Sequence, residues 1–127
     1  MLATETVRKA LRGEGRIGAK ILEHKPHELC VSSITVAELR YGAEHSGSQK
    51  LSSLIDTFVG SIEVVDFDEN SARQFGTLAM EMAKRGTIIG EFELLVAAHA
   101  IGIEATLVTD NADPFARVFG LYVENWT

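Results

Sequence analysis

The strongest constraint on the fold is an alternation of short apolar runs with longer helical patterns. The runs have the length of strands and are flanked by turn residues; they cover 29–32, 62–65, 106–109 and 121–123. Met1 and Leu2 add a fifth, very short candidate strand. Strands separated by helical segments pair in parallel through right-handed crossovers. The pattern therefore predicts an α/β domain with three layers, α/β/α, around a central, mainly parallel sheet.

Capping residues and apolar positions at helical spacing predict four helices between these runs. The first expected helix starts with a capping box at Thr35 to Glu38, and the second starts at about Ser48. The third runs from a cap near Asp68 to just before Gly86, and the fourth covers about 91–101. The last is almost wholly apolar, as expected for a helix pressed against a sheet. Residues 5–12 form a further, basic helical segment.

Length and composition are typical of one globular domain, which we expect to span 1–127. Hydrophobic residues make up 46% of the 127 residues and charged residues 24%, so a single core can form. No run approaches the roughly 20 apolar residues that cross a bilayer, and basic residues follow soon after the start. A cytoplasmic protein without a membrane partner is expected. The single cysteine, Cys30, is expected to be a buried structural thiol.

The charge is unevenly distributed along the chain. The net charge is −6, which excludes a surface that attracts nucleic acid everywhere but allows a local basic face. Residues 1–50 carry +2, whereas residues 51–127 carry −8. The acidic part consists either of solvated helix faces or of a site that uses carboxylates.

Residues 13–18 match the pattern G-x-G-x-x-G letter for letter. A dinucleotide site requires a strand immediately before this pattern and a helix that opens at it. Here a basic helical segment precedes the pattern instead. A glycine-rich break between two short helices is therefore the favoured interpretation.

Polar residues that follow the strands are the first candidates for a site, because ligands of parallel sheets bind at the carboxyl ends of strands. Glu38 is either a structural capping residue or a catalytic or metal-binding one. Glu93 lies in the first turn of the most apolar helix, where a carboxylate needs a partner. Asp110 and Asn111 follow the run 106–109. Such carboxylates suit Mg²⁺ or Mn²⁺, and an ion of this kind supports phosphodiester hydrolysis without histidine.

Four segments together resemble one known family. They are Ser32-Ser33-Ile34-Thr35-Val36-Ala37-Glu38-Leu39-Arg40-Tyr41-Gly42, Ile89-Gly90-Glu91-Phe92-Glu93-Leu94-Leu95-Val96-Ala97-Ala98-His99-Ala100, Thr106-Leu107-Val108-Thr109 and Gly120-Leu121-Tyr122-Val123-Glu124-Asn125-Trp126. Their order and spacing closely resemble the VapC-type toxins of the PIN-domain ribonuclease family. The resemblance implies a small α/β domain, Mg²⁺- or Mn²⁺-dependent cleavage of RNA, particularly tRNA, homodimerisation, and neutralisation by a VapB-type antitoxin in bacteria.

The family places acidic residues at four positions, and this chain matches them unevenly. Glu38 matches the second, Glu93 replaces an aspartate at the third, and Asn111 matches the fourth with Asp110 beside it. The first is the aspartate of a Leu-Asp-Thr-Asn start, where this chain has Ala3. Glu5 could compensate in part if its side chain bent back from the helix start.

The resemblance thus predicts a metal-dependent endoribonuclease with Glu38, Glu93 and Asp110 as metal ligands and Asn111 as a further catalytic residue. Ala3 indicates an eroded toxin, a variant made harmless, or a homologue with altered metal geometry. The basic residues of the first third, from Arg8 to Lys25, guide RNA to the site or are an ordinary exposed surface. The alternative function is a catalytically silent protein that dimerises and sequesters the antitoxin.

Overall fold

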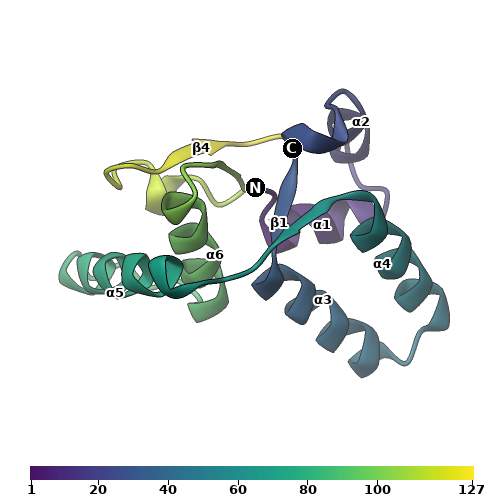
Figure 1. Cartoon of the computed structure of the whole chain (residues 1–127), viewed down its shortest axis with the longest axis horizontal. Coiled ribbons are helices and arrows are strands. Elements are labelled where there is room, and N and C mark those ends of the chain that lie inside the picture. The colour runs from purple at the N-terminus through teal and green to yellow at the C-terminus, as the bar shows by residue number, and fades with distance from the viewer.

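Strands and helices alternate along the chain as the apolar pattern predicts. The computed structural model describes all residues, 1–127, and its elements are coloured in chain order in Figure 1. In order they are α1 (Thr4–Leu11), α2 (Ile17–Leu22), η1 (Pro26–Glu28), β1 (Cys30–Ser32), α3 (Ser33–Ser46), α4 (Gln49–Ser61), β2 (Glu63–Val65), α5 (Glu69–Lys84), α6 (Glu91–Gly102), β3 (Thr106–Val108), η2 (Asp113–Phe115) and β4 (Tyr122–Glu124). None of these helices is long and apolar enough to cross a membrane.

The strands form two parallel pairs that the N-terminal segment joins. β1 pairs with β2, and β3 pairs with β4. Between the pairs, the amide of Leu2 donates to the carbonyl of Cys30 at 2.9 Å, and the amide of Ala3 donates to the carbonyl of Val108 at 2.9 Å. Leu2 also forms a parallel bridge with Val108. The expected fifth strand is therefore present as a single bridge, and it places Ala3 at the centre of the sheet.

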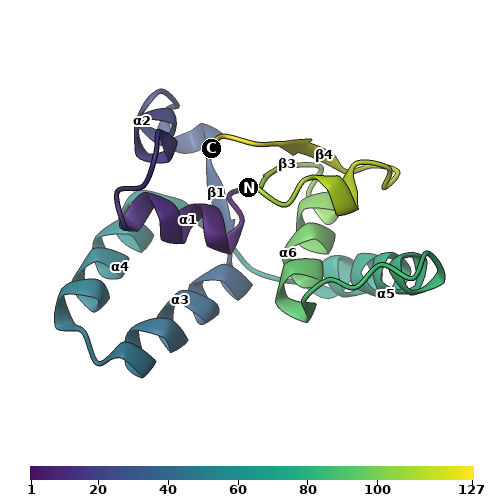
Figure 2. The same ribbon diagram turned by 180° about the vertical axis from the view of Figure 1, so that it is seen from behind.

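The two faces of the sheet contact two separate apolar cores. Met1, Ala3 and Leu107 belong to a core that includes α5 and α6. Leu2 and Val108 belong to a second core with α1, α3 and α4. Successive residues of a strand point to opposite faces, so this alternation shows helices on both sides. The three-layer prediction is confirmed, and Figure 2 shows α1 and α3 on one side of the N-terminal segment with α6 on the other.

The start of α3 differs from the predicted capping box. The hydroxyl of Ser32, at the end of β1, accepts from the amide of Ile34 at 3.0 Å, so α3 begins at Ser33. Thr35 lies inside the helix and is fully buried. The capping-box prediction was wrong because Ser32 caps the helix earlier. Glu38 consequently lies beyond the first turn, too far along to cap the helix.

The other helix boundaries agree with their sequence signals. The Ser48 hydroxyl caps α4 by accepting from the amide of Leu51 at 3.1 Å. Asp68 caps α5 by accepting from the amide of Ser71 at 2.9 Å. α5 ends at Lys84, just before Gly86, whose φ of 67° is a conformation that favours glycine.

The glycine-rich segment is a break between α1 and α2, as predicted. Gly13 and Gly15 have φ values of 71° and 57°, which explains why glycine stands at both positions. Cys30, by contrast, is half-buried rather than fully buried, and it packs against the core beside α6.

Candidate active site

A pocket of about 340 Å³ lies at the carboxyl ends of the central strands. Residues that follow the N-terminal segment, β1 and β3 meet there, which is where a parallel sheet binds its ligands. All four predicted site residues line this pocket: Glu38, Glu93, Asp110 and Asn111. The remaining lining residues are Ala3, Thr4, Glu5, Arg8, Val96, Leu107 and Thr109.

Glu38 projects from α3 into the pocket and is held by a hydroxyl. The hydroxyl of Thr4 lies 2.7 Å from Oε1 of Glu38 and 3.0 Å from the hydroxyl of Thr35. A hydroxyl carries one proton, so Thr4 donates to the carboxylate while Thr35 donates to Thr4. Thr4 and Thr35 are both buried. The arrangement fixes the direction of the Glu38 carboxylate without neutralising its charge.

Glu93 is held in the first turn of α6 by an amide. Nδ2 of Asn111 donates to Oε1 of Glu93 at 2.9 Å, and the backbone amide of Asn111 donates to the hydroxyl of Thr109 at 3.0 Å. The helix N-terminus also favours a negative charge at Glu93. Glu93 is half-buried, whereas Glu91 is exposed. Glu93 is thus the inward-facing acid of this turn, as expected.

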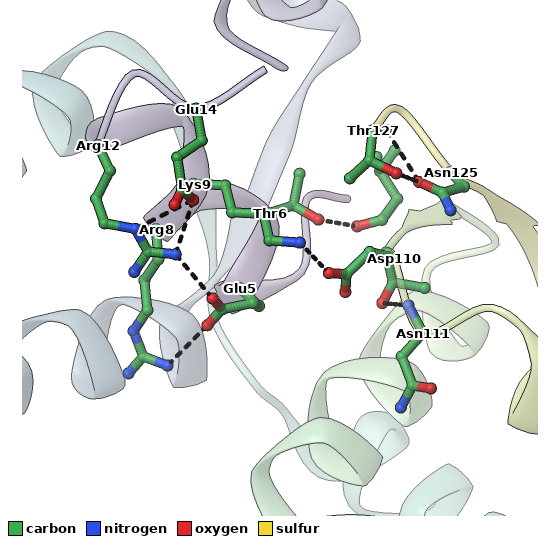
Figure 3. Close-up of polar contacts among 12 residues, drawn as sticks. Glu5, Thr6, Arg8, Lys9, Arg12, Glu14, Asp110, Asn111, Asn125 and Thr127 are labelled. Atoms are coloured by element: carbon green, nitrogen blue, oxygen red, sulfur yellow. Dashed lines mark hydrogen bonds and ion pairs between the residues drawn. The ribbon is translucent and has the colours of Figure 1, made fainter. Parts of the chain in front are cut away.

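Asp110 has a cationic partner. The ammonium group of Lys9, on α1, forms an ion pair with Asp110, although the two residues are far apart in the sequence (Figure 3). The hydrogen bond to Asp110 raises the pKa of Lys9 above its ordinary value. The Lys9 ammonium therefore neutralises the Asp110 carboxylate at the edge of the pocket.

Glu5 is also paired with cations. One carboxylate oxygen lies 3.0 Å from the guanidinium of Arg12, and the other lies 3.5 Å from that of Arg8. Figure 3 shows Glu5 between these two arginines. The hydrogen bonds that Arg12 donates to Glu14 and, to a lesser extent, to Glu5 raise the pKa of Arg12. Glu5 contacts Arg8 of α1 and Arg12 just after this helix, so its carboxylate does not replace the missing acid at position 3.

Ala3 contributes only a methyl group where the resemblance implies a carboxylate. Ala3 is 8% exposed and lines the pocket. It occupies the N-cap position of α1, where its side chain makes no capping hydrogen bond. The chain contains no group of three or more His, Cys, Asp and Glu side chains arranged to hold a metal ion. Glu38 and Glu93 nevertheless line one pocket, as a shared ion would require.

Sequence reasoning missed two of the contacts that shape the site. The hydrogen bond from Thr4 to Glu38 depends on the sheet bringing α1 beside α3. The Lys9–Asp110 pair joins distant segments and leaves no local signal. Asp68, which also follows a strand, lies outside the pocket and caps α5.

The sequence matches a known family over most of its length. A family model described as "PIN domain" matches residues 5–120. The chain is 40% identical over 103 residues to "Ribonuclease VapC2" of Rickettsia felis, covering 80% of this chain and 77% of that protein. It is 35% identical over 99 residues to "tRNA(fMet)-specific endonuclease VapC" of Salmonella typhimurium, covering 77% and 75%.

Solved structures match the whole fold. The VapBC2 complex of Rickettsia felis bound to a promoter DNA fragment contains a chain with a TM-score of 0.87 and 36% identity, covering 100% of this chain and 98% of that one. The DNA-bound VapBC complex of Salmonella typhimurium gives a TM-score of 0.89 at 30% identity, covering 100% and 97%. Both solved structures therefore share the fold over the full length of this chain.

Proposed function

This chain belongs to the PIN-domain family and, within it, to the VapC ribonucleases of toxin–antitoxin systems, and we propose that it cleaves RNA with a divalent metal ion held at Glu38 and Glu93. The observation that carries the proposal is that these two carboxylates line one pocket at the carboxyl ends of the strands. Their protein partners are neutral donors, a hydroxyl and an amide. Both acids therefore keep the charge that binds a cation.

The side chains of the pocket are of the type that binds Mg²⁺ or Mn²⁺, but fewer of them are available than the resemblance implies. PIN-domain ribonucleases generally depend on divalent metal ions. Mg²⁺ typically takes one or two protein carboxylates and keeps several waters, which Glu38 and Glu93 can satisfy. Asp110, the third proposed ligand, becomes available only when Lys9 releases it. Ala3 supplies no oxygen, so affinity for the ion is expected to be low.

Each residue of the pocket has a distinct proposed role. A bound ion would polarise the scissile phosphodiester and lower the pKa of water. Thr4 keeps the Glu38 carboxylate aimed into the pocket, and Asn111 does the same for Glu93. Arg8 lines the pocket with a guanidinium, which pairs with phosphate oxygens and would bind the RNA backbone. We propose tRNA as the RNA class.

The proposed protein partners follow from the resemblance to the VapC-type toxins. A VapB-type antitoxin is the partner type of the matching complexes. An antitoxin cation that paired with Glu38 and Glu93 would block the ion and the RNA together. We also propose that the chain forms a homodimer.

A second candidate function rests on Ala3 and on the paired acids. With no acid at position 3, and with Glu5 and Asp110 bound to cations, the pocket is less acidic than its four acidic side chains suggest. Such a pocket could retain antitoxin binding after losing catalysis. The chain would then act by sequestering antitoxin.

One experiment separates the two functions. Purified, antitoxin-free protein is incubated with a tRNA pool and Mn²⁺, beside Ala3→Asp and Glu38→Gln variants and an EDTA control. An active nuclease gives cleavage that disappears in Glu38→Gln and in EDTA. We expect Ala3→Asp to cleave on the order of 10²- to 10³-fold faster, the size of one electrostatic stabiliser of a transition state.

Other outcomes lead to different conclusions. Cleavage only by Ala3→Asp would identify a disabled nuclease and support the sequestering function. Cleavage that survives Glu38→Gln would contradict the proposed site. Cleavage by neither protein, together with no binding of a VapB-type antitoxin, would contradict both functions.

A further inference from the structure

A second pocket adjoins the acidic one. It has a volume of about 450 Å³ and is lined by Arg8, Ala37, Glu38, Tyr41 and Phe92. Arg8 and Glu38 line both pockets, so the second continues the first. Its walls come from α1, α3 and α6, which converge beside the N-terminal segment in Figure 2.

The second pocket exposes two aromatic rings from two different helices. Tyr41 of α3 is 72% exposed and Phe92 of α6 is 55% exposed. The Tyr41 ring is also stacked with the imidazole of His45, one turn further along α3, with centroids 6.1 Å apart and an interplanar angle of 18°. Large exposed rings that line a pocket indicate a binding surface rather than core packing.

From these observations we propose that Tyr41 and Phe92 form a subsite that stacks an unpaired nucleobase next to the phosphodiester held at the acidic pocket. This inference rests on the proposed ribonuclease function. Exposed rings stack on any base, because every base has a π face. Arg8 lies between the two pockets, where its guanidinium can contact the phosphate that joins the two nucleotides.

The composition of the pocket favours RNA over an apolar protein segment. A buried apolar side chain would cover Arg8 and Glu38 and displace the water that solvates these two charges. A nucleotide offers hydrogen-bonding edges and a phosphate to these same groups. Arg8 is also free to turn, since its 3.5 Å contact with Glu5 is at the long limit of a hydrogen bond.

The subsite restricts where the RNA can be cut. Bases inside an RNA helix are stacked on one another, so only a base in a loop, bulge or end can enter between Tyr41 and Phe92. The subsite therefore selects cleavage next to an unpaired nucleotide.

The test uses a single-stranded RNA that carries 2-aminopurine, whose fluorescence is quenched when the base stacks on an aromatic ring. The full chain is titrated in EDTA, which prevents cleavage, and compared with Tyr41→Ala and Phe92→Ala. Tyr122→Ala is the matched control, because Tyr122 on β4 is also 72% exposed and lies outside this pocket. Tyr41→Phe keeps the ring, and thermal unfolding confirms that each variant folds.

We expect each alanine variant in the subsite to bind the RNA about fivefold to a hundredfold more weakly and to lose the quenching. Tyr41→Phe and Tyr122→Ala should behave as the parent chain. Equal binding and quenching in all variants would overturn the subsite and leave the ribonuclease function intact. Failure of the parent chain to bind RNA would overturn the subsite, whereas the ribonuclease function is overturned only by the cleavage experiment with Mn²⁺. Loss of antitoxin binding with unchanged RNA binding would assign the two rings to the protein partner and overturn the subsite.

Discussion

Two pairs of acids line one pocket and differ in what holds them. The inner acids, Glu38 and Glu93, accept hydrogen bonds from a hydroxyl and an amide. The rim acids, Glu5 and Asp110, form ion pairs with Arg8, Arg12 and Lys9. A neutral donor orients a carboxylate and leaves its charge in place, whereas a cation cancels the charge.

This difference explains how one pocket can hold acids that form ion pairs, Glu5 and Asp110, beside acids that can bind a metal ion, Glu38 and Glu93. The ion pairs of the rim acids link α1 to the residue that follows it and to the loop after β3. Glu38, Glu93 and Glu5 are all half-buried, so burial does not separate the inner acids from the rim acids. Residue type and position in the sequence do not distinguish the pairs, but their partners do.

The largest expected difference between the pairs is in catalysis. Glu38→Gln should lower the rate of RNA cleavage on the order of 10²- to 10³-fold, because it removes a charge that acts on the developing transition state. Glu5→Gln removes a similar charge from the same pocket and should leave the rate within about threefold. Single-turnover cleavage of a labelled tRNA measures both rates. A larger loss in Glu5→Gln would invert the assignment.

A smaller difference is expected in stability. Thr4→Val keeps the shape of the side chain and leaves the Glu38 carboxylate without its donor, so we expect the free energy of unfolding to fall by about 1.5–3 kcal/mol, as for a hydrogen bond to a charged group. Thr6→Val is the matched control, because the buried Thr6 hydroxyl donates to the neutral carbonyl of Val108 at 3.1 Å. It should destabilise by about 0.5–1.5 kcal/mol. Urea denaturation compares the two, and an equal loss would show that the charge is unimportant.

The folding stability of the chain should depend moderately on pH, because of a buried histidine near the inner acids. His99 of α6 is fully buried and contacts the hydroxyl of Ser32, which caps α3, at 2.8 Å. Burial lowers the pKa of His99 from 6.5, although Asp68 opposes the shift. The unfolded chain therefore binds a proton more readily, and stability should fall as the pH drops below 6.5.

A His99→Gln variant isolates this effect. Its stability should be nearly constant between pH 7 and 5, whereas that of the parent chain falls. Asp68 does not interfere in this window, because hydrogen bonds from Ser71 lower its pKa from 3.8. Urea denaturation at each pH measures the free energy of unfolding. If this free energy changed equally with pH in both proteins, the role given to the burial of His99 would be contradicted.

The smallest expected effect on stability comes from the ion pair between Lys9 and the rim acid Asp110. Lys9→Met removes the partner of Asp110, and we expect the urea midpoint to stay within experimental error because exposed ion pairs contribute little. The affinity for Mn²⁺ should rise, since Asp110 loses the cation that competes with the metal ion. An unchanged affinity would show that Asp110 takes no part in holding the ion.

The sequence predicts the elements of this fold better than the contacts of its site. The apolar runs and caps locate the strands, α4, α5 and α6 because those signals are local. The capping box at Thr35 is wrong, since Ser32 and Thr35 both can cap and only the end of β1 decides between them. The resemblance brings Glu38 and Glu93 to one pocket, but their neutral partners come from distant segments.

Binding of Mn²⁺ at equilibrium tests the division into inner and rim acids most directly. Calorimetric titration should show weak binding to the parent chain, tighter binding to Ala3→Asp, and none to Glu38→Gln or Glu93→Gln. Glu5→Gln should match the parent chain. Binding that survives both inner substitutions and is lost in Glu5→Gln would contradict the account.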